Sequence, residues 1–350
     1  IRHLIRVLFL TRLGFDAYKK IKKRYFTSPL FPPKIKENTV YTLYYSRSQH
    51  TKNNLQPNIR FLNLYVKKQL LQKYGIESLD VPIPGNLKFK EIIEVRLIHC
   101  YDYFKAAYIY KEEDNELSSN PNNRNFLAID IGLNNLCTMI NNVNNQPIII
   151  DGKKLKSINH YYNKTISHYN SITYKVNMQF NSHKINSLYS KRNNYIKNYL
   201  HQTSSYIIKY CQKYNINTII IGYNKGLKQN IIMKKKTNSK ETFYQIPFTK
   251  LINYLEYKSK LNSINFIIQD ESYTSKANSI KLDMISKDSE FHGKRIKRGL
   301  FKTDDNHLIN ADVNAAINIA RKCIGESLNP WINELASIGS VNMPIRVRII

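Results

Sequence analysis

Three acidic residues lie at the ends or starts of predicted strands and helices after residue 125 of the chain. Asp130 ends the apolar run 126–129, and Glu271 follows a strand-like segment at 266–269. Asp312 lies in the first turn of a segment with helical periodicity. Taken singly, each acid also fits an ordinary loop cap, strand end or helix start. Taken together, they form a set of carboxylates at the ends of predicted elements.

Carboxylate oxygens are ligands that Mg²⁺ prefers in proteins. Two such ions about 4 Å apart activate a water and stabilise the departing 3′ oxygen of a phosphodiester. We therefore predict two-metal-ion hydrolysis of phosphodiesters, with Asp130, Glu271 and Asp312 as catalytic residues and Mg²⁺ ligands. Asp270, directly before Glu271, is the competing candidate for the middle position.

The charge of the chain indicates the kind of partner. The 350 residues contain 54 Lys and Arg against 25 Asp and Glu, which gives a formal net charge of +29. Because 42% of the residues are hydrophobic, the chain is not a disordered basic tail. Basic clusters lie at 153–156, 234–236 and 294–298, and few acids surround them. Nucleic acid is the simplest polyanion for such a folded body, although a solvated surface is the ordinary alternative for any one cluster.

The hydrophobic pattern predicts an α/β (α+β multidomain) chain. Strands that alternate with helices after residue 125, opening with a β-meander, are typical of a ribonuclease H-like fold. A long helical stretch at 153–214 is predicted to form a helical hairpin. The predicted divisions are a basic helical region at 1–30, a small β-barrel at 31–112, a linker at 113–124, the α/β domain at 125–325 and a C-terminal tail at 326–350.

Cysteine usage excludes two classes of site. Cys100, Cys137, Cys211 and Cys323 lie far apart and form no CxxC pair, which argues against a disulfide framework and a four-cysteine zinc site. They are predicted to be free thiols. The apolar start of the chain is interrupted by arginines and is predicted to be an amphipathic helix rather than a signal peptide. No membrane segment is expected.

Several motifs in order resemble the TnpB/OrfB family of insertion-sequence proteins, which carry a RuvC-like nuclease domain and are related to Fanzor and type V CRISPR nucleases. The likeness is dense from about 125 to 323 and thinner from 31 to 112, where strands resemble the family's wedge domain. The motifs are Ala128-Ile-Asp-Ile-Gly-Leu-Asn-Asn-Leu136, Gly152-Lys-Lys-Leu-Lys-Ser-Ile-Asn159, Tyr161-Tyr-Asn-Lys164, Lys191-Arg-Asn193, Tyr199-Leu-His201, Ile221-Gly-Tyr-Asn-Lys-Gly226, Lys228-Gln229, Gln245-Ile-Pro247, Glu271-Ser-Tyr-Thr-Ser-Lys276, Gly293-Lys-Arg-Ile-Lys-Arg-Gly-Leu300 and Leu308-Ile-Asn-Ala-Asp-Val-Asn-Ala-Ala316.

The resemblance implies an RNA-guided, Mg²⁺-dependent DNA endonuclease of a transposable element, with guide RNA and target DNA as partners and no small-molecule substrate. It implies that Asp130 is the first RuvC aspartate and Asp312 the last. It also implies a cytoplasmic, nucleoid-associated protein if the host is bacterial. The implied nucleic-acid contacts are Lys153, Lys154, Lys156, Lys191, Arg192, Lys225, Lys228, Lys276, Arg295, Lys297 and Arg298.

The chain departs from the family pattern in three places. The glutamate that usually follows the central strand is absent after 218–222, and Glu271 occupies the later position seen in Fanzor and one TnpB branch. The segment 277–309 holds no cysteine where many members have a zinc ribbon, so a metal-free insert without zinc is expected. The chain begins late relative to the family, which predicts a truncated or degenerate copy.

Two alternatives stay open. One is a truncated or nuclease-dead protein that binds guide RNA and DNA without cutting. The other is a single-strand transposase with a tyrosine nucleophile, which the sequence disfavours because no His-hydrophobe-His motif accompanies a helical tyrosine.

Overall fold

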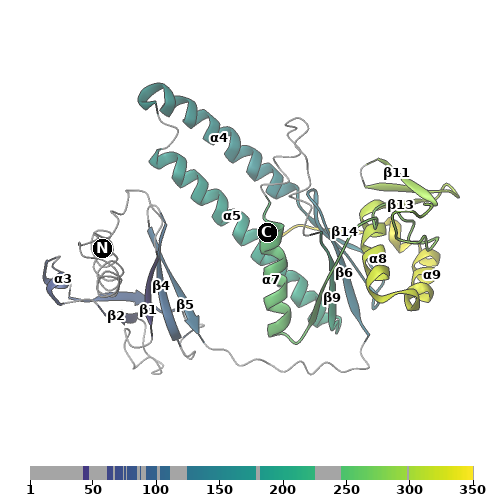
Figure 1. Ribbon diagram of the computed structural model, residues 1–350, viewed down its shortest axis with the longest axis horizontal. Coiled ribbons are helices and arrows are strands. Elements are labelled where there is room, and N and C mark those ends of the chain that lie inside the picture. Colours follow the sequence, from purple (N-terminus) through teal and green to yellow (C-terminus); the bar gives the residue numbers. More distant parts are fainter. Residues whose placement is uncertain are drawn as a thin grey trace, which may run out of the picture. The chain divides into compact units, whose positions relative to one another are not determined.

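The computed structural model divides the chain into two units, Ile1–Glu113 and Asp114–Ile350, which are described separately (Figure 1). The residues described are 42–46, 61–65, 68–73, 75, 77–84, 87, 92–100, 103–110, 124–178, 182–224, 246–297 and 299–349. The basic helix predicted for 1–30 lies outside this set, as does the predicted linker except for its last residue.

The described part of unit 1 consists mainly of β-structure. Strands β1 (Thr42–Ser46), β4 (Ile92–Cys100) and β5 (Tyr103–Tyr110) form an antiparallel sheet, and β2 (Phe61–Leu64) pairs with β3 (Leu79–Pro82). A short helix, α3 (Lys68–Lys73), follows β2. Leu62, Val95 and other side chains from both sheets share one buried core. The described residues therefore form two sheets over a common core, and they do not include a closed barrel.

A six-stranded mixed sheet is the centre of the described part of unit 2, with the order β10-β9-β6-β7-β8-β14. The β6–β7–β8 meander is antiparallel, whereas β9 pairs with β6, β10 with β9, and β14 with β8 in parallel. The strands span Phe126–Ile131 (β6), Asn135–Asn141 (β7), Ile148–Asp151 (β8), Thr218–Gly222 (β9), Asn265–Gln269 (β10) and Ile345–Val347 (β14). The predicted β-meander, followed by strands that alternate with helices, is present.

Alternation along the central strands decides which residues face which helices. On β6, Leu127 and Ile129 enter the core that contains the helices α5 (His183–Lys213) and α7 (Phe248–Leu261). Phe126 and Ala128 enter the core on the opposite face, beside α8 (Ala311–Ile324). Each fully buried aliphatic side chain contributes about 1.5–3 kcal/mol, so both faces are firmly specified. Because side chains alternate, Asp130 lies on the α8 face.

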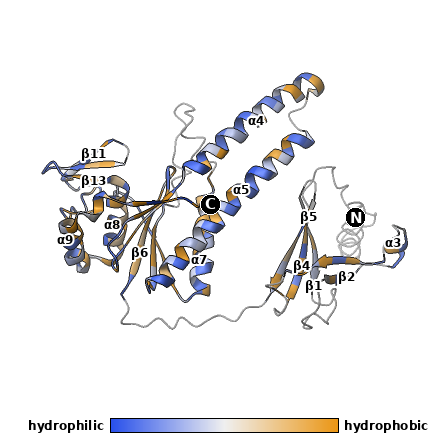
Figure 2. Ribbon diagram, turned by 180° about the vertical axis from the view of Figure 1, so that it is seen from behind, coloured by the Kyte–Doolittle hydropathy of each residue, from blue (hydrophilic) through white to orange (hydrophobic). Residues whose placement is uncertain are grey.

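The helical hairpin predicted for 153–214 is present as α4 (Lys153–Asn177) and α5. Gly152 precedes α4 at a close backbone approach, since a Cβ there would lie 2.4 Å from the carbonyl oxygen of Leu133. Ile166 of α4 packs against Ile185 and Leu188 of α5. Figure 2 shows that the central strands are mostly hydrophobic whereas α4 and α5 are mostly hydrophilic. The hairpin thus has one packed seam and much exposed polar surface.

The segment 326–350, predicted to be a tail, belongs to the fold. It forms the helix α9 (Asn329–Ile338), two short 3₁₀ turns and the sheet strand β14. Trp331 packs edge-on against Phe126 with ring centroids 5.2 Å apart, and its Nε1 donates a hydrogen bond of 2.7 Å to Asn145. Parallel pairing of β14 with β8 makes residues close to the C-terminus part of the main sheet.

A second, smaller sheet lies between β10 and α8 in the chain. Strands β11 (Gly293–Lys297), β12 (Leu300–Thr303) and β13 (Leu308–Asn310) pair in antiparallel order. Its core contains Phe301, Ile309 and Ala311, which are all buried. Because β13 leads directly into α8, this sheet is attached to the start of the helix that carries Asp312.

Candidate active site

The end of β6 places Asp130 beside the first turn of α8. Asp130 pairs with Thr138 of β7 in the antiparallel register and continues the alternation that puts Ala128 against α8. Asp312 is the second residue of α8. Asn310 caps that helix, since its side-chain oxygen accepts hydrogen bonds from the backbone N–H groups of Asp312 and Val313, both at 3.1 Å. The two aspartates therefore come from a strand end and a helix start on one side of the sheet.

Glu271 reaches the same place from the end of β10, which is separated from β6 by β9 in the sheet. Gln269 pairs with Gly222 at the ends of the parallel strands β10 and β9. A Cβ built on Gly222 would lie 3.4 Å from the Cβ of Glu271 and 2.3 Å from Cδ1 of Ile319. Ile319 of α8 therefore occupies the space that a side chain at position 222 would need. The acidic side chain next to this position is supplied by Glu271.

The three carboxylates line one cavity of about 700 Å³. Its wall also contains the β6–β7 loop and the turn after β10. The lining residues are Asp130, Ile131, Gly132, Leu133, Asn134, Asn135, Asn224, Glu271, Ser272, Thr274, Ser275, Arg295, Asp312 and Ala315. Asp270, the competing candidate, is not among them. Its carboxylate instead accepts hydrogen bonds from Lys322 at 2.6 Å and from the Ser272 hydroxyl at 2.9 Å.

The electrostatics of the cavity are those of crowded, poorly compensated acids. Burial, followed by the charges of Asp312 and Glu271, raises the pKa of Asp130 well above its usual value, and Arg295 opposes that rise. Burial and the neighbouring Asp270 raise the pKa of Glu271. By contrast, its bond to Lys322 lowers the pKa of Asp270. Added positive charge in the cavity would therefore be stabilising.

A chain of polar contacts surrounds Asp312. Arg295 of β11 donates to Asp312 Oδ1 at 2.9 Å, and Asn135 Nδ2 donates to Asp312 Oδ2 at 2.6 Å. The side-chain oxygen of Asn135 in turn accepts a bond of 3.0 Å from Arg346 of β14, which also donates to Asp151 at 3.2 Å. Both oxygens of Asp312 are thus engaged by protein donors. Sequence reasoning missed Asn135 and Arg346, because residues 135, 312 and 346 meet only through the sheet.

The donor chemistry of the cavity fits a hard cation. The lining residues include the carboxylates of Asp130, Glu271 and Asp312, which offer oxygen ligands, and they include no histidine or cysteine. Within the described ranges, however, no group of three or more His, Cys, Asp or Glu side chains is already arranged to hold a metal ion. Each carboxylate oxygen has two lone pairs, so a Mg²⁺ bound at Asp312 would either share that side chain with Arg295 and Asn135 or displace one of them.

Two family models match consecutive parts of the chain. The family described as a probable transposase, OrfB of the IS605 type, matches residues 107–228, and the family described as the Cas12f1-like TNB domain matches residues 248–319. The chain is a TnpB/OrfB-type protein. The resemblance found in the sequence motifs is confirmed.

Solved structures that resemble this TnpB/OrfB-type chain include two complexes. A Cas12f1–sgRNA–target DNA complex matches with 15% identity and a TM-score of 0.41, covering 90% of this chain and 84% of that one. A CRISPR–Cas12f ternary complex matches with 15% identity and a TM-score of 0.40, covering 90% of this chain and 72% of that one. No curated protein matches the chain.

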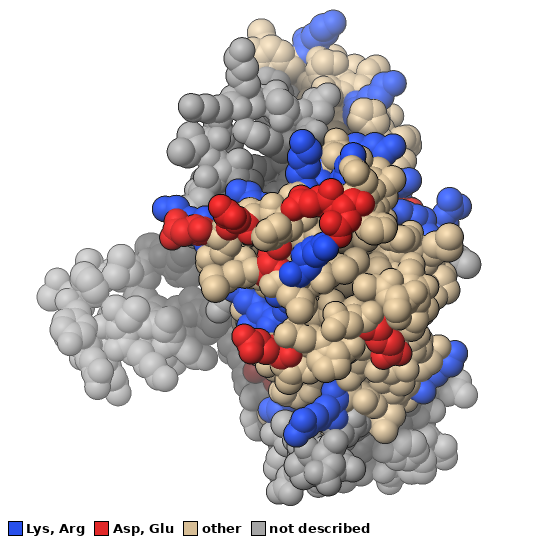
Figure 3. Space-filling view, turned by 90° about the vertical axis from the view of Figure 1, so that its right-hand side faces the viewer, with Lys and Arg blue, Asp and Glu red and all other residues tan. Residues whose placement is uncertain are grey.

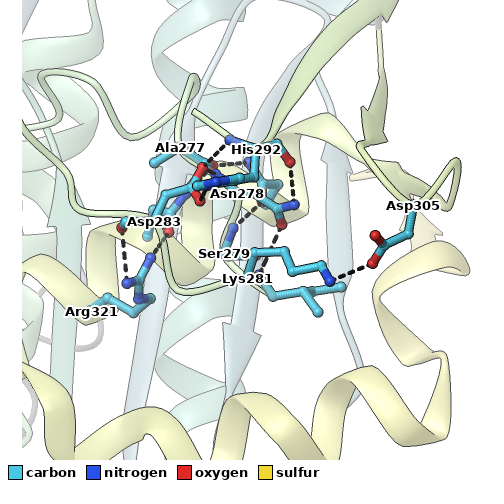
Figure 4. A network of polar contacts seen from close by, with 11 residues as sticks. Ala277, Asn278, Ser279, Lys281, Asp283, His292, Asp305 and Arg321 are labelled. Carbon is cyan, nitrogen blue, oxygen red and sulfur yellow. Dashed lines mark hydrogen bonds and ion pairs between the residues drawn. The ribbon is translucent and has the colours of Figure 1, made fainter. Parts of the chain in front are cut away.

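The segment 277–309 of the TnpB/OrfB-type chain is held by polar side chains. The buried carboxylate of Asp283 accepts hydrogen bonds from the backbone N–H groups of Asn278 at 2.8 Å and His292 at 2.9 Å, and its other oxygen contacts His292 Nδ1 at 2.8 Å (Figure 4). Arg321 of α8 donates to the Asp283 carbonyl at 3.0 Å. This network fixes the start of the insert at the position where zinc ribbons occur in many family members.

Asparagines of α8 fix the turn that carries Glu271. Asn318, fully buried, donates hydrogen bonds of 2.9 and 2.7 Å to the carbonyl oxygens of Thr274 and Ala277, and Asn314 also donates to Ala277. Residues 314 and 318 are one helical turn apart, so they present their amides to the same segment. The helix that supplies Asp312 therefore also positions the segment after Glu271.

The predicted nucleic-acid contacts fall into three groups. Lys153, Lys156, Lys191, Lys276, Arg295 and Lys297 are exposed, and of these Arg295 also donates to Asp312. Lys154 and Arg192 have structural partners: Lys154 Nζ donates to the Ile349 carbonyl at 3.3 Å, and Arg192 Nε donates to Asn159 at 2.8 Å. Lys225, Lys228, Arg298 and the cluster 234–236 lie outside the described residues.

The face of unit 2 that carries α8, α9 and the β11–β13 sheet has mixed charge. Figure 3 shows acidic side chains lying among basic ones on this face.

Cys137 and Cys211 are buried free thiols, and Cys323 is a half-buried one. In the described part of the chain no helix is both long and apolar enough to cross a membrane.

Proposed function

We propose that this chain is an RNA-guided DNA endonuclease that hydrolyses phosphodiesters at Asp130, Glu271 and Asp312. The observation that carries the proposal is the convergence of these three carboxylates on one cavity from β6, β10 and α8. The partners are a guide RNA and a target DNA, the two classes of nucleic acid in the Cas12f1 complex. In this proposal residues 125–325 are a RuvC-like domain of the ribonuclease H kind, and residues 31–112 are the wedge-like domain.

Two Mg²⁺ ions held by the three carboxylates would activate the attacking water and stabilise the leaving 3′ oxygen. Water adds to phosphorus, the P–O3′ bond breaks, and the products carry a 5′-phosphate and a 3′-hydroxyl. Arg295 and Lys297 of β11 hold phosphate oxygens of the strand beside the carboxylates. Asn135 keeps Asp312 oriented through the hydrogen bond of 2.6 Å. Asp270 is not assigned a role, because Lys322 holds it outside the cavity lining.

A nuclease-dead binding protein is the second candidate. The observation that favours it is the engagement of both Asp312 oxygens by Arg295 and Asn135. A protein that only binds guide RNA and DNA needs its basic surfaces and has no need of a free Asp312. The two candidates differ in a single measurable property, which is metal-dependent cleavage of a matched target.

The test is co-expression of the chain with the flanking DNA of its element, followed by cleavage of a matched target in Mg²⁺. Asp130→Ala, Glu271→Gln and Asp312→Asn are each expected to lower cleavage by at least about 10³-fold, because each removes a metal ligand. Asp270→Asn is the matched control and is expected to retain most activity. Cleavage that survives Glu271→Gln but not Asp270→Asn refutes the assignment of Glu271. RNA binding without any cleavage by the native chain supports the binding protein instead.

A further inference from the structure

One side of α4 carries a continuous series of cationic and imidazole side chains. Lys153, Lys156, His160, Lys164, His168 and Lys175 are all exposed. Successive residues in this series are three or four positions apart, except that Ser171 lies between His168 and Lys175. The six residues therefore share one side of the helix. We call these six residues the α4 stripe. It is about 33 Å long at 1.5 Å per residue.

The surroundings of α4 leave the stripe without acidic partners among the described residues. Leu155, Asn159 and Ile166 are buried on the opposite side of the helix, where Arg192 and the core residues of α5 meet them. No Asp or Glu occurs anywhere from Gly152 to Lys240. None of the four stripe lysines forms an ion pair with a described residue. The α4 stripe therefore presents uncompensated positive charge to solvent.

Its spacing and surroundings fit a phosphate backbone. Successive cationic or hydrogen-bonding groups recur about every 5–6 Å along the helix axis, which allows contact with several phosphates of one strand. Exposed Ser157 and Ser167 lie between the lysines and can pair with ribose 2′-hydroxyl groups. Tyr161 is 62% exposed beside the stripe and offers a ring on which an unpaired base can stack.

The origin of α4 indicates which nucleic acid it holds. The helix begins at Gly152, whose N–H bonds to the carbonyl oxygen of Asn134 in the cavity wall at 2.8 Å. From there α4 leads away from the central sheet (Figure 1). A nucleic acid held along the outer turns of α4 therefore lies away from the phosphodiester at the carboxylates, and the exposed serines favour RNA through its 2′-hydroxyl groups.

We propose that the α4 stripe binds the backbone of the guide RNA. This inference rests on the proposed RNA-guided function but concerns a surface outside the cleavage site. It adds Lys164, Lys175, His160 and His168 to the basic residues that motif resemblance identifies.

The experiment compares salt dependence of RNA binding for three full-length proteins in an Asp130→Ala background. One has no further change, one has Lys153, Lys156, Lys164 and Lys175 changed to Gln, and the control has Lys209, Lys213, Lys250 and Lys260 changed to Gln. The probes are a 30-base-pair RNA duplex of arbitrary sequence and the DNA duplex of the same sequence. Circular dichroism checks that helix content is unchanged, since Lys and Gln have similar helix propensities.

The stripe variant is expected to show a weaker salt dependence. Each lysine that neutralises one phosphate adds about 0.7–0.9 to the slope of log K against log salt, so removing four such lysines reduces that slope by roughly 3. Between 50 and 200 mM salt, the unchanged protein then loses about 60-fold more affinity for RNA than the stripe variant does. The control variant is expected to keep the parental slope within about one unit.

Two outcomes overturn the proposal. An equal change of slope in the control variant refutes the stripe as a site. Binding of the DNA duplex that equals binding of the RNA duplex, with the same decrease in the stripe variant, refutes RNA as its occupant. Cleavage is measured separately, so a chain that never cuts can still show the predicted slopes.

The edge strand β14 supports a second, independent inference about the carboxylate cavity. Arg346 bonds to Asn135, which bonds to Asp312, and Arg346 is anchored by the nearly buried Asp151 of β8. Arg346 itself is not part of the cavity lining. We infer that Arg346 is a positioning residue that holds the Asn135 amide toward Asp312, and this also rests on the proposed Mg²⁺ site.

The test is a Mg²⁺ titration followed by the shift in melting temperature, with cleavage as a second readout. Arg346→Ala is expected to raise the Mg²⁺ midpoint about tenfold or more, as for other residues that orient metal ligands, and Arg346→Lys to recover part of it. Arg348→Ala, two residues along the same segment, is the matched control and is expected to change nothing. A lower melting temperature in Arg346→Ala with an unchanged Mg²⁺ midpoint refutes the positioning role. Absence of any Mg²⁺ shift in the native chain refutes the proposed metal site itself.

Discussion

Asp130→Asn is expected to make the metal-free protein more stable while abolishing cleavage. Asp130 shares the cavity with two further carboxylates, and Arg295 is the basic side chain in the described lining. Asn keeps nearly the same shape but removes a partly buried charge and its repulsion by Asp312 and Glu271. The substitution therefore relieves an electrostatic cost without opening a cavity.

The expected change in melting temperature depends on the size of unit 2, and its pH dependence follows from the raised pKa of Asp130. Removing such a functional strain typically stabilises by about 0.5–2 kcal/mol. For a unit the size of Asp114–Ile350, each kcal/mol shifts the melting temperature by about 2–4 °C, so we expect a rise of roughly 1–8 °C. Because folding raises the pKa of this acid, the native state binds more protons than the unfolded state. The contribution of Asp130 to the stability of the native chain therefore falls as pH rises from about 4 through its folded-state pKa, and the advantage of Asn grows in the same direction.

Differential scanning fluorimetry at pH 5 and pH 8, without metal and with a Mg²⁺ titration, measures these effects. Mg²⁺ at 100 times its dissociation constant is expected to stabilise the native chain by about 2.7 kcal/mol and Asp130→Asn by much less. Asp270→Asn is the matched control with the opposite sign, since its bond to Lys322 lowers the pKa of Asp270 and the substitution removes a favourable contact. A lower melting temperature in Asp130→Asn, or a full Mg²⁺ shift in that variant, refutes the reasoning.

Three further outcomes are expected. Gly222→Ala lowers the free energy of unfolding by about 1–3 kcal/mol in urea titrations, because its Cβ would lie 2.3 Å from Ile319 Cδ1, and Ile319→Val recovers part of the loss; no loss refutes the tight contact. Asn318→Ala lowers it by about 1–3 kcal/mol by leaving buried carbonyl oxygens of Thr274 and Ala277 without this donor, whereas the exposed Asn253→Ala costs much less. His292→Gln lowers the melting temperature most below pH 6.5, because Asp283 raises the folded-state pKa of His292 and that stabilisation disappears as pH rises through it; a pH-independent difference refutes the ion pair.

Local pattern was sufficient to predict most elements of unit 2. The apolar run at 126–129 and the β-branched run at 218–221 predicted buried strands, and apolar residues on one side of 310–320 predicted α8. A strand that is buried on both faces has a continuous apolar run instead of alternating polar and apolar residues, so it is easily recognised. The strands β2, β3, β11, β12, β13 and β14 were missed. They are only three to five residues long, and β14 also pairs with a strand that is distant in the chain.

The sequence was sufficient to identify the acidic residues of the candidate site, but not the residues that form hydrogen bonds with them. Asp130, Glu271 and Asp312 were recognisable from their places after apolar segments and in family motifs. Asn318 and Arg346 carry no such signal, and Asn135 lies in a quoted motif without an assigned role, because an asparagine or arginine acquires its role only from the group that it meets. The mapping of the three acids as catalytic residues stays a prediction until the cleavage series is measured.

The sequence by itself determined the charge of the chain, its membership of the TnpB/OrfB type and the alternation that turns Asp130 toward α8. These properties depend on residue type and on local periodicity of two or 3.6 residues. Only the tertiary structure decided that Glu271 rather than Asp270 lines the cavity, that β14 completes the sheet, and that Arg295 and Asn135 engage Asp312. Those outcomes depend on parallel pairing and on α8 packing over Gly222, which bring together residues that are far apart along the chain.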